Sequence, residues 1–134
     1  MPEFSAKSMA KLSTVHEELQ LLFMQVVVHM DCTIIEGYRD QRTQNEYYAI
    51  KKSKLLWPES KHNTSPSLAV DVAPYLPGKG VSWDSKQCYL LAGFVKAKAA
   101  ELGIKIRWGG DWDSDNDLSD QTFNDLVHYE LIEE

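Results

Sequence analysis

SKH at 60–62, AVD at 69–71 and DLVHYE at 125–130 are the stretches that decide how this sequence folds and what it can do. Together they contain two imidazoles and a carboxylate, the ligand set of a catalytic zinc site. A second carboxylate precedes the last histidine by three residues. Zinc held by three protein ligands lowers the pKa of a bound water to about 7, and a nearby carboxylate can take the proton. The stretches therefore predict metal-assisted hydrolysis in front of a small sheet.

The candidate metal ligands are His62, Asp71 and His128, and Asp125 is the candidate proton acceptor. Alternate residues of a strand share one face, so the ring of Tyr129 should point away from the side that His128 faces. Three separate segments can thus converge on one metal. A lone histidine is more often a hydrogen-bonded polar residue than a ligand, so the spacing by itself leaves both interpretations open.

The size and charge of the chain exclude some classes of function. With 134 residues, it has room for one domain around one core. Its net charge of -6 argues against broad phosphate neutralisation of a nucleic acid and against simple capture by an anionic membrane. A local basic strip of Lys51, Lys52, Lys54 and Lys61 is still compatible with an acidic protein.

Hydrophobic spacing predicts an α+β fold in one domain over 1–134, with a small, mainly antiparallel sheet backed by helices. The first eight residues, 1–8, are expected to be a loose start. Helices are expected over 15–30, 40–54 and 84–102. Strands are expected over 32–36, 68–72, 104–108 and 127–132, with a polar, acidic loop over 109–123.

Individual residues refine the predictions for two of these helices. In the last one, Asp84 is the expected N-cap and Gly103 the expected C-cap. In the helix expected over 40–54, the expected packing residues are Tyr47, Tyr48 and Ile50.

Two features bear on the compartment in which the chain is made. Cys32 and Cys88 lie in apolar stretches without a CxxC spacing, which favours buried free thiols, although a disulfide stays open. The first residues lack the apolar core and cleavage site of a secretory signal. The longest apolar run, 21–30, is too short to span a bilayer. We therefore expect the chain to begin in a cytoplasm.

The patterns Ser-x-His, Ala-x-Asp and acid-x-x-His resemble those of the D-Ala-D-Ala carboxypeptidase and VanX/VanY-type zinc peptidases. The similarity is greatest to phage endolysins that cut the L-alanyl-D-glutamate bond of peptidoglycan, and it covers about 16–131. This resemblance implies a Hedgehog/DD-peptidase-like fold. Further matching stretches are TIIEGYR at 33–39, Gln44, DVAPY at 71–75, GVSWD at 80–84 and IRWGGDW at 106–112.

The resemblance implies a role for each residue of the candidate site. His62, Asp71 and His128 correspond to zinc ligands, and Asp125 corresponds to the general base. Arg39 corresponds to an arginine that stabilises the oxyanion or grips substrate, which suits the charge that peptide hydrolysis develops. A surface ion pair is the alternative interpretation for Arg39.

A second group of residues is expected to support the ligands or to contact substrate. Ser60 corresponds to a residue beside the first ligand, and Gln44 falls where the next helix usually carries glutamine. Glu130 and Tyr129 flank the last ligand. A loop cap is the alternative for Ser60, and an exposed strand residue is the alternative for Glu130.

One departure from the family pattern concerns the spacing of the ligands. The family usually has seven residues from the first histidine to the aspartate, with a glycine between them. Here His62 and Asp71 are nine residues apart, without a glycine. We expect a longer loop that changes one side of the cleft and bears on bond specificity.

Several functions fit this resemblance. The first is a zinc-dependent endopeptidase acting on the stem peptides of peptidoglycan. A D,D- or L,D-carboxypeptidase on the same site and a non-catalytic, zinc-bearing binding module are the alternatives. A phage lysis enzyme would be made in the host cytoplasm and released to the wall by a membrane-permeabilising partner. We expect a monomer that has no nucleic-acid partner and no stable membrane association.

The acidic loop and the tryptophans have two interpretations each. Asp113, Asp115 and Asp117 alternate as in a calcium loop, but the glycine and glutamate of an EF-hand are missing, which favours a solvated loop. Trp83 and Trp108 could form the floor of a substrate groove, but we expect both to pack in the core.

Overall fold

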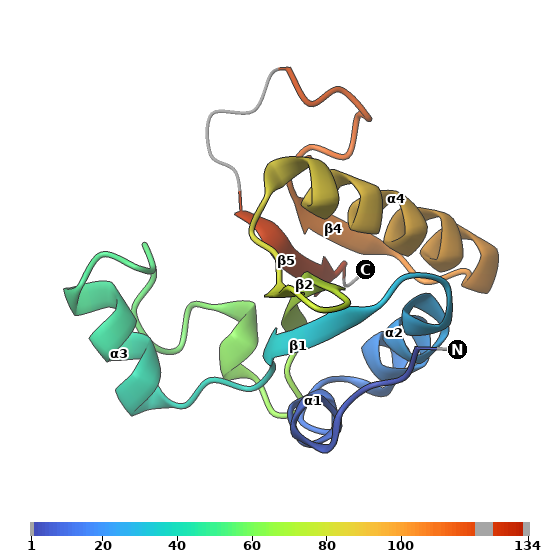
Figure 1. Cartoon of the computed structure of the whole chain (residues 1–134). Coiled ribbons are helices and arrows are strands. Elements are labelled where there is room, and N and C mark those ends of the chain that lie inside the picture. Colours follow the sequence, from blue (N-terminus) through green and yellow to red (C-terminus); the bar gives the residue numbers. More distant parts are fainter. Residues whose placement is uncertain (1, 120–124, 133–134) are drawn as a thin grey trace.

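The sheet is antiparallel throughout, and helices cover one of its faces in the computed structural model (Figure 1). The structure describes residues 2–119 and 125–132. The strand order is β1-β2-β5-β4, with β3 paired to β2. The strands are β1 (Cys32–Glu36), β2 (Ala69–Leu76), β3 (Gly80–Val81), β4 (Ile106–Gly109) and β5 (Asp125–Leu131). The predicted α+β fold is confirmed.

Two long helices cover the core face of the sheet. They are α2 (Glu17–His29) and α4 (Ser85–Leu102), and they pack against each other. Phe23 of α2 meets the ring of Tyr129 of β5 edge-on, at 5.4 Å between centroids. The predicted caps of α4 are confirmed: Asp84 accepts a hydrogen bond from the backbone of Gln87, and Gly103 adopts the left-handed conformation.

The expectation of a loose start over 1–8 is wrong for residues 5–8. Helix α1 (Ala6–Leu12) begins within it, with Ser5 as the N-cap. The hydroxyl of Ser8 accepts a hydrogen bond from the backbone N–H of Ile34, and Lys11 Nζ donates to the carbonyl of Ile35. The short helix thus supplies hydrogen-bond partners to backbone groups on the outer edge of β1. Without them, this edge would be open to pairing with another chain.

Helix α3 (Gln41–Ala49) is shorter than predicted and lies apart from α2 and α4 in Figure 1. The expectation that Tyr48 and Ile50 are packing residues is wrong, because Tyr48 is exposed and Ile50 is 69% exposed. The buried residue of α3 is Gln44. This helix is therefore anchored by polar contacts and not by an apolar face. A short 3₁₀ helix, η1 (Lys61–Asn63), follows it.

Strand β2 runs to Leu76, beyond the predicted end at 72, and includes Pro74. The carbonyl of Pro74 accepts a hydrogen bond from Ser82, so the imide nitrogen faces the same side. On that side the pairing with β5 has already ended at Asp71. The missing N–H therefore breaks no hydrogen bond with β5, and the pairing of β2 with β3 begins only at Tyr75.

Both cysteines are buried free thiols, as predicted. No described helix combines the length and apolar character that crossing a membrane would require.

Candidate active site

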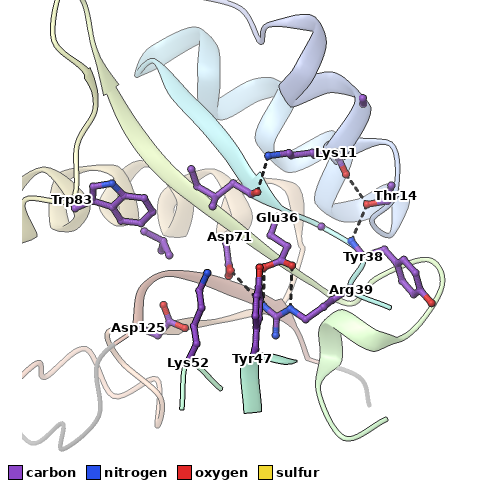
Figure 2. A pocket seen from close by; sticks show the side chains of 14 residues that line it. Lys11, Thr14, Glu36, Tyr38, Arg39, Tyr47, Lys52, Asp71, Trp83 and Asp125 are labelled. Carbon is purple, nitrogen blue, oxygen red and sulfur yellow. Dashed lines mark hydrogen bonds and ion pairs between the residues drawn. The ribbon is translucent and has the colours of Figure 1, made fainter. Parts of the chain in front are cut away.

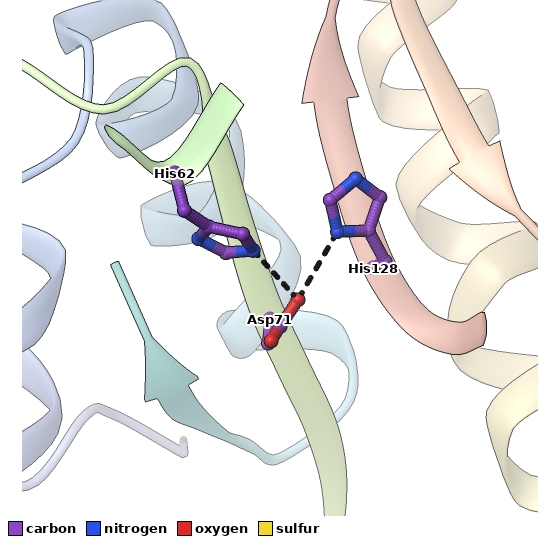
Figure 3. Close-up of side chains that lie close together, drawn as sticks. All are labelled: His62, Asp71 and His128. Atoms are coloured by element: carbon purple, nitrogen blue, oxygen red, sulfur yellow. Dashed lines mark hydrogen bonds and ion pairs between the residues drawn. The ribbon is translucent and has the colours of Figure 1, made fainter. Parts of the chain in front are cut away.

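Two histidines point at one carboxylate on the face of the sheet opposite to α2 and α4 (Figure 3). His62 Nε2 lies 3.2 Å from Asp71 Oδ1, and His128 Nδ1 lies 3.3 Å from the same oxygen. The three groups can offer one ligand atom each, all within 4.8 Å of one another. The structure thus brings the three predicted metal ligands together.

Strand register places two of the three ligands side by side. Asp71 of β2 is paired with His128 of β5 in the antiparallel ladder. The neighbouring residues Val70 and Tyr129 are also paired, and both are fully buried in the core. Because side chains alternate across a strand, burying that pair turns Asp71 and His128 toward the opposite face.

The third ligand comes from η1. Ser60 caps this helix: its hydroxyl accepts a hydrogen bond from the backbone N–H of His62, and the side chain of Asn63 accepts one from the backbone of Ser60. Ser60 is therefore a helix cap, which is the alternative that the sequence left open for it. The hydroxyl fixes the backbone that carries the ligand.

Hydrogen bonds on the far side of each imidazole set which nitrogen faces the cluster. His62 Nδ1 lies 2.7 Å from the carbonyl of Gly37, which can only accept, so Nδ1 carries a proton and Nε2 is the nitrogen that faces Asp71. His128 Nε2 lies 2.8 Å from Glu130 Oε1, which leaves Nδ1 toward Asp71. This is the outer support that metal-binding histidines usually have.

The electrostatics of the cluster favour a positive charge. Burial alone would raise the pKa of Asp71, but hydrogen bonds from His128 and His62 outweigh it and hold that pKa below its ordinary value. Burial would lower the pKa of His128, but Asp71 and Glu130 raise it to about 9. Two carboxylates facing one imidazole thus stabilise a cation at this place.

The donor set fits zinc. Two imidazole nitrogens and one carboxylate oxygen converge, as in three-ligand catalytic zinc sites. The residues that would hold the ion are His62, Asp71 and His128.

Asp125 begins β5 and borders the cluster. Burial is the main cause that raises the pKa of its carboxyl above the ordinary aspartate value, and the negative charge of Asp71 adds to it. The residue is paired with Gly109 of β4, and a Cβ at Gly109 would collide with the backbone carbonyl of Asp125. The glycine therefore allows the two backbones to approach closely and sets where Asp125 lies.

Arg39 is buried beside the cluster and is held from three sides. Its Nε and Nη2 donate to the two carboxylate oxygens of Glu36, at 3.1 and 2.9 Å. Its Nη1 donates to Gln44 Oε1 at 2.8 Å, and Nη2 lies 3.9 Å from Asp71 Oδ2. Guanidinium has five N–H groups, so donors remain for a substrate oxygen. The surface interpretation of this residue is wrong, since Arg39 is buried.

Gln44 is the hub of this part of the site. Its Oε1 accepts hydrogen bonds from Arg39 and Asn63, and its Nε2 donates to the hydroxyl of Ser53 and the carbonyl of Leu55. Every polar atom of the buried amide is thus used. Gln44 therefore positions Arg39 and leaves no polar atom free to contact substrate in the cleft.

Sequence reasoning missed two members of this network. Asn63 joins η1 to the backbone of Arg39 and to Gln44, and Glu36 holds the guanidinium. The Ser60-x-x-Asn63 spacing is a capping signal that could have pointed to Asn63. No sequence pattern points to Glu36, because the turn after β1 decides that Arg39 reaches it.

The remaining predicted site residues separate into two groups. Glu130 is buried and bonded to His128, as expected of a residue that supports a ligand, so the alternative of an exposed strand residue is wrong. Tyr129 is fully buried against Phe23 in the core, so the expectation that it contacts substrate or a ligand is wrong. Alternation along β5 accounts for this difference between neighbours.

Two hollows meet at the site. The outer hollow, of about 780 Å³, is lined by α1, β1, Asp71 and Trp83 (Figure 2). The ligand hollow, of about 380 Å³, is lined by His62, His128 and the segment 51–55. Trp83 was expected in the core but is 62% exposed on the rim, whereas Trp108 is buried as predicted.

The acidic loop forms a second cluster of carboxylates. Asp111, Asp113 and Asp115 each place one oxygen within 4.8 Å of the others. Asp117, which the sequence grouped with Asp113 and Asp115, is not part of this cluster, and its Oδ1 accepts two hydrogen bonds from Ser119. The buried Asp111 takes its place. The end of the predicted loop, 120–123, lies outside the described residues.

Three convergent ligands, a carboxylate with a raised pKa and a restrained guanidinium, all opening onto a cleft, are the arrangement of a metal-dependent peptidase. Comparison with known proteins gives the family. The profile of the family described as phage L-alanyl-D-glutamate peptidase matches residues 2–132. This chain belongs to that family and is a peptidase.

Two relatives extend over nearly the whole chain. The L-alanyl-D-glutamate peptidase of Escherichia phage T5 is 33% identical over 137 residues, covering 97% of this chain and 98% of the relative. The crystal structure of the Serratia marcescens L-Ala D-Glu endopeptidase ChiX superposes with a TM-score of 0.80 at 28% identity, covering 98% of this chain and 91% of that chain.

Proposed function

We propose that this protein is a zinc-dependent peptidoglycan peptidase that hydrolyses the L-alanyl-D-glutamate bond of the stem peptide. The convergence of His62, Asp71 and His128 beside Asp125 and Arg39 is the observation that carries the proposal. The names of both relatives support the choice of bond.

A bound zinc would supply a water of lowered pKa and a positive charge next to the scissile carbonyl. The residues of the chain do the rest. Asp125 takes the proton of the attacking water and returns it to the leaving amine. Its raised pKa suits both steps, because it lies closer to neutrality than that of an ordinary aspartate. Arg39, held by Glu36 and Gln44, stabilises the charge that develops on the carbonyl oxygen.

The test of this mechanism is Asp125→Asn. We expect kcat to fall by about 10² to 10⁴, because general acid-base catalysis is typically worth that much, while the zinc content stays at the wild-type value. The control is Glu101→Gln on the exposed face of α4, outside both carboxylate clusters, which should keep more than half of the activity. Wild-type turnover by Asp125→Asn would remove the base assignment.

The ligand assignment has its own test. His128→Ala should abolish zinc binding, measured by metal analysis of purified protein. His29→Ala, a histidine of α2 outside the cluster, should leave the zinc content unchanged. Full zinc content in His128→Ala would contradict the assignment.

We further propose that the protein is a phage lysis enzyme. It would act as a monomer, start in the host cytoplasm and reach the wall through a membrane-permeabilising partner. The phage relative supports this proposal. Lysis of cells that express the protein only when a membrane-permeabilising protein is co-expressed is the expected result.

A calcium ion at the acidic loop is a separate proposal. Asp111, Asp113 and Asp115 offer oxygen ligands, which calcium prefers, and the loop leads toward Asp125. We expect added calcium to change activity or the melting temperature. Indifference of both would contradict the proposal.

A further inference from the structure

Lys52 stands where the two hollows meet. Three residues line both of them: Arg39, Asp125 and Lys52. The first two have roles in the proposed reaction. Lys52 belongs to the basic strip of the sequence, and the proposed reaction gives it no role.

The chain holds Lys52 in place over an aromatic ring. After α3, Lys51 adopts a φ of 65°, which turns the backbone so that the N–H of Lys52 donates to the carbonyl of Tyr47 at 2.8 Å. Lys52 Nζ then lies 4.2 Å from the centroid of the Tyr47 ring. Figure 2 shows this ring edge-on between Lys52 and Arg39, whose Cζ lies 4.8 Å from the centroid. A cation over a ring face gains electrostatic stabilisation, which restricts where the ammonium points.

The charge of Lys52 differs from that of the other cations around the cleft. Arg39 is neutralised by Glu36 and lies near Asp71, and Lys61 pairs with Glu130 at 3.2 Å. Among residues 2–119 and 125–132, the ammonium of Lys52 has no ion-pair or hydrogen-bond partner. An acidic protein thus keeps an uncompensated positive charge beside its candidate base.

The chemistry of the proposed substrate supplies an anion at this place. Glutamate has two carboxyl groups, and only one of them can carry the next residue of the stem. The residue on the leaving side of the L-alanyl-D-glutamate bond therefore keeps one free carboxylate. Since Asp125 returns a proton to the leaving amine, this residue must lie next to Asp125, and so next to Lys52.

Resting on the proposed function, we propose that Lys52 binds the free carboxylate of the leaving residue and so makes the enzyme selective for an acidic residue there. Arg39 stabilises the charge on the carbonyl oxygen, and Lys52 binds the free carboxylate. The Tyr47 ring between them keeps the two cations apart, each on its own substrate group.

The experiment compares two synthetic stem peptides that differ in one group. One carries D-glutamate with its free carboxylate, and the other carries the same residue with that carboxylate converted to a carboxamide. Each is offered to the wild-type enzyme, to Lys52→Met and to the control Lys79→Met, at an exposed lysine that lines neither hollow. Methionine keeps an unbranched chain over Tyr47 but removes the charge. Melting temperatures check that both exposed substitutions leave the fold intact.

We expect Lys52→Met to lose about 10- to 100-fold in kcat/KM on the carboxylate peptide, mostly through KM, because a charge-assisted hydrogen bond made in ground and transition states is lost. On the carboxamide peptide, the wild type and Lys52→Met should be equal within twofold. Lys79→Met, which removes the same charge in the turn between β2 and β3, should lose less than threefold on either peptide.

Equal losses of Lys52→Met on both peptides would overturn this inference while leaving the proposed function in place. Equal cleavage of both peptides by the wild type would do the same. Failure of the wild type to cleave either peptide would contradict the proposed function itself, and the inference with it.

Discussion

The site has two halves that are built on different physical principles. The sheet half consists of Asp71, His128 and Glu130, on β2 and β5. The helical half consists of Arg39, Gln44 and His62, carried by the turn after β1, by α3 and by η1. Behind the sheet half lies an apolar core that includes the paired Val70 and Tyr129. Behind the helical half lies a network of buried hydrogen bonds.

The difference shows how each half can fail. In the sheet half, ladder register fixes the ligands, and the apolar core supplies the stability from the other face. Stability and site geometry are therefore separable there. In the helical half, the same hydrogen bonds that hold the fold also aim Arg39, so that a loss of stability and a loss of function should occur together.

The largest expected effect is on the core behind the sheet half. Phe23→Ala should lower the free energy of unfolding by about 3 to 5 kcal/mol, because it leaves a cavity against Tyr129. Chemical denaturation measures this change. Activity per folded molecule should stay within threefold of the wild type. The control on the same helix is Leu21→Ala, which is exposed and should change stability by less than about 1 kcal/mol. A large loss of specific activity in folded Phe23→Ala would break the comparison.

The second effect is on the helical half. Gln44→Leu should cost about 2 to 4 kcal/mol, because Arg39, Asn63 and Leu55 each lose a partner to the buried amide. Unlike Phe23→Ala, it should also reduce kcat by at least tenfold, since the guanidinium is no longer aimed. Gln41→Leu, at an exposed position of the same helix, is the matched control. Unchanged kcat in folded Gln44→Leu would show that the network serves stability alone.

A third substitution concerns the contact between β4 and β5. Gly109→Ala should cost about 1 to 3 kcal/mol through the collision with the carbonyl of Asp125, and should lower kcat by displacing that residue. Gly93→Ala on α4 is the control, because nothing lies within 4 Å of the added Cβ, and the helix should gain about 0.5 to 1 kcal/mol. Thermal unfolding and kcat of both variants test this. Equal behaviour of the two would contradict the close approach.

The smallest expected effect is on the outer support of a ligand. Glu130→Gln weakens the hydrogen bond to His128 Nε2 and should reduce zinc affinity by about 10- to 100-fold. Competition with a chelator measures the affinity. The control is Glu101→Gln, on the exposed face of α4. Wild-type affinity in Glu130→Gln would mean that the carboxylate does not support the ligand.

The sequence predicted the sheet half better than the helical half, and the reason is physical. Asp71 and His128 share the open face because each stands next to an apolar residue, Val70 or Tyr129, in a strand whose side chains alternate, and this is a local pattern within each strand. The contacts of Gln44 link segments separated by five to nineteen positions and depend on turns that no local pattern specifies.

The errors elsewhere have similar causes. Helix α1 has only seven residues, too few to show a helical repeat, and its function is to cover the edge of β1 through Ser8 and Lys11. Trp83 was assigned to the core by its residue type, whereas its place after the β2–β3 hairpin leaves it on the rim of the outer hollow.

The most direct test of the account is digestion of purified Gram-negative peptidoglycan by the zinc-loaded protein, with mass analysis of the released fragments. We expect new C-terminal L-alanine and new N-terminal D-glutamate. Asp125→Asn, treated in parallel, should release at most about a hundredth as much. Release of terminal D-alanine alone would assign a carboxypeptidase to the same site. No release by a folded, zinc-replete sample would contradict the account and favour a binding module.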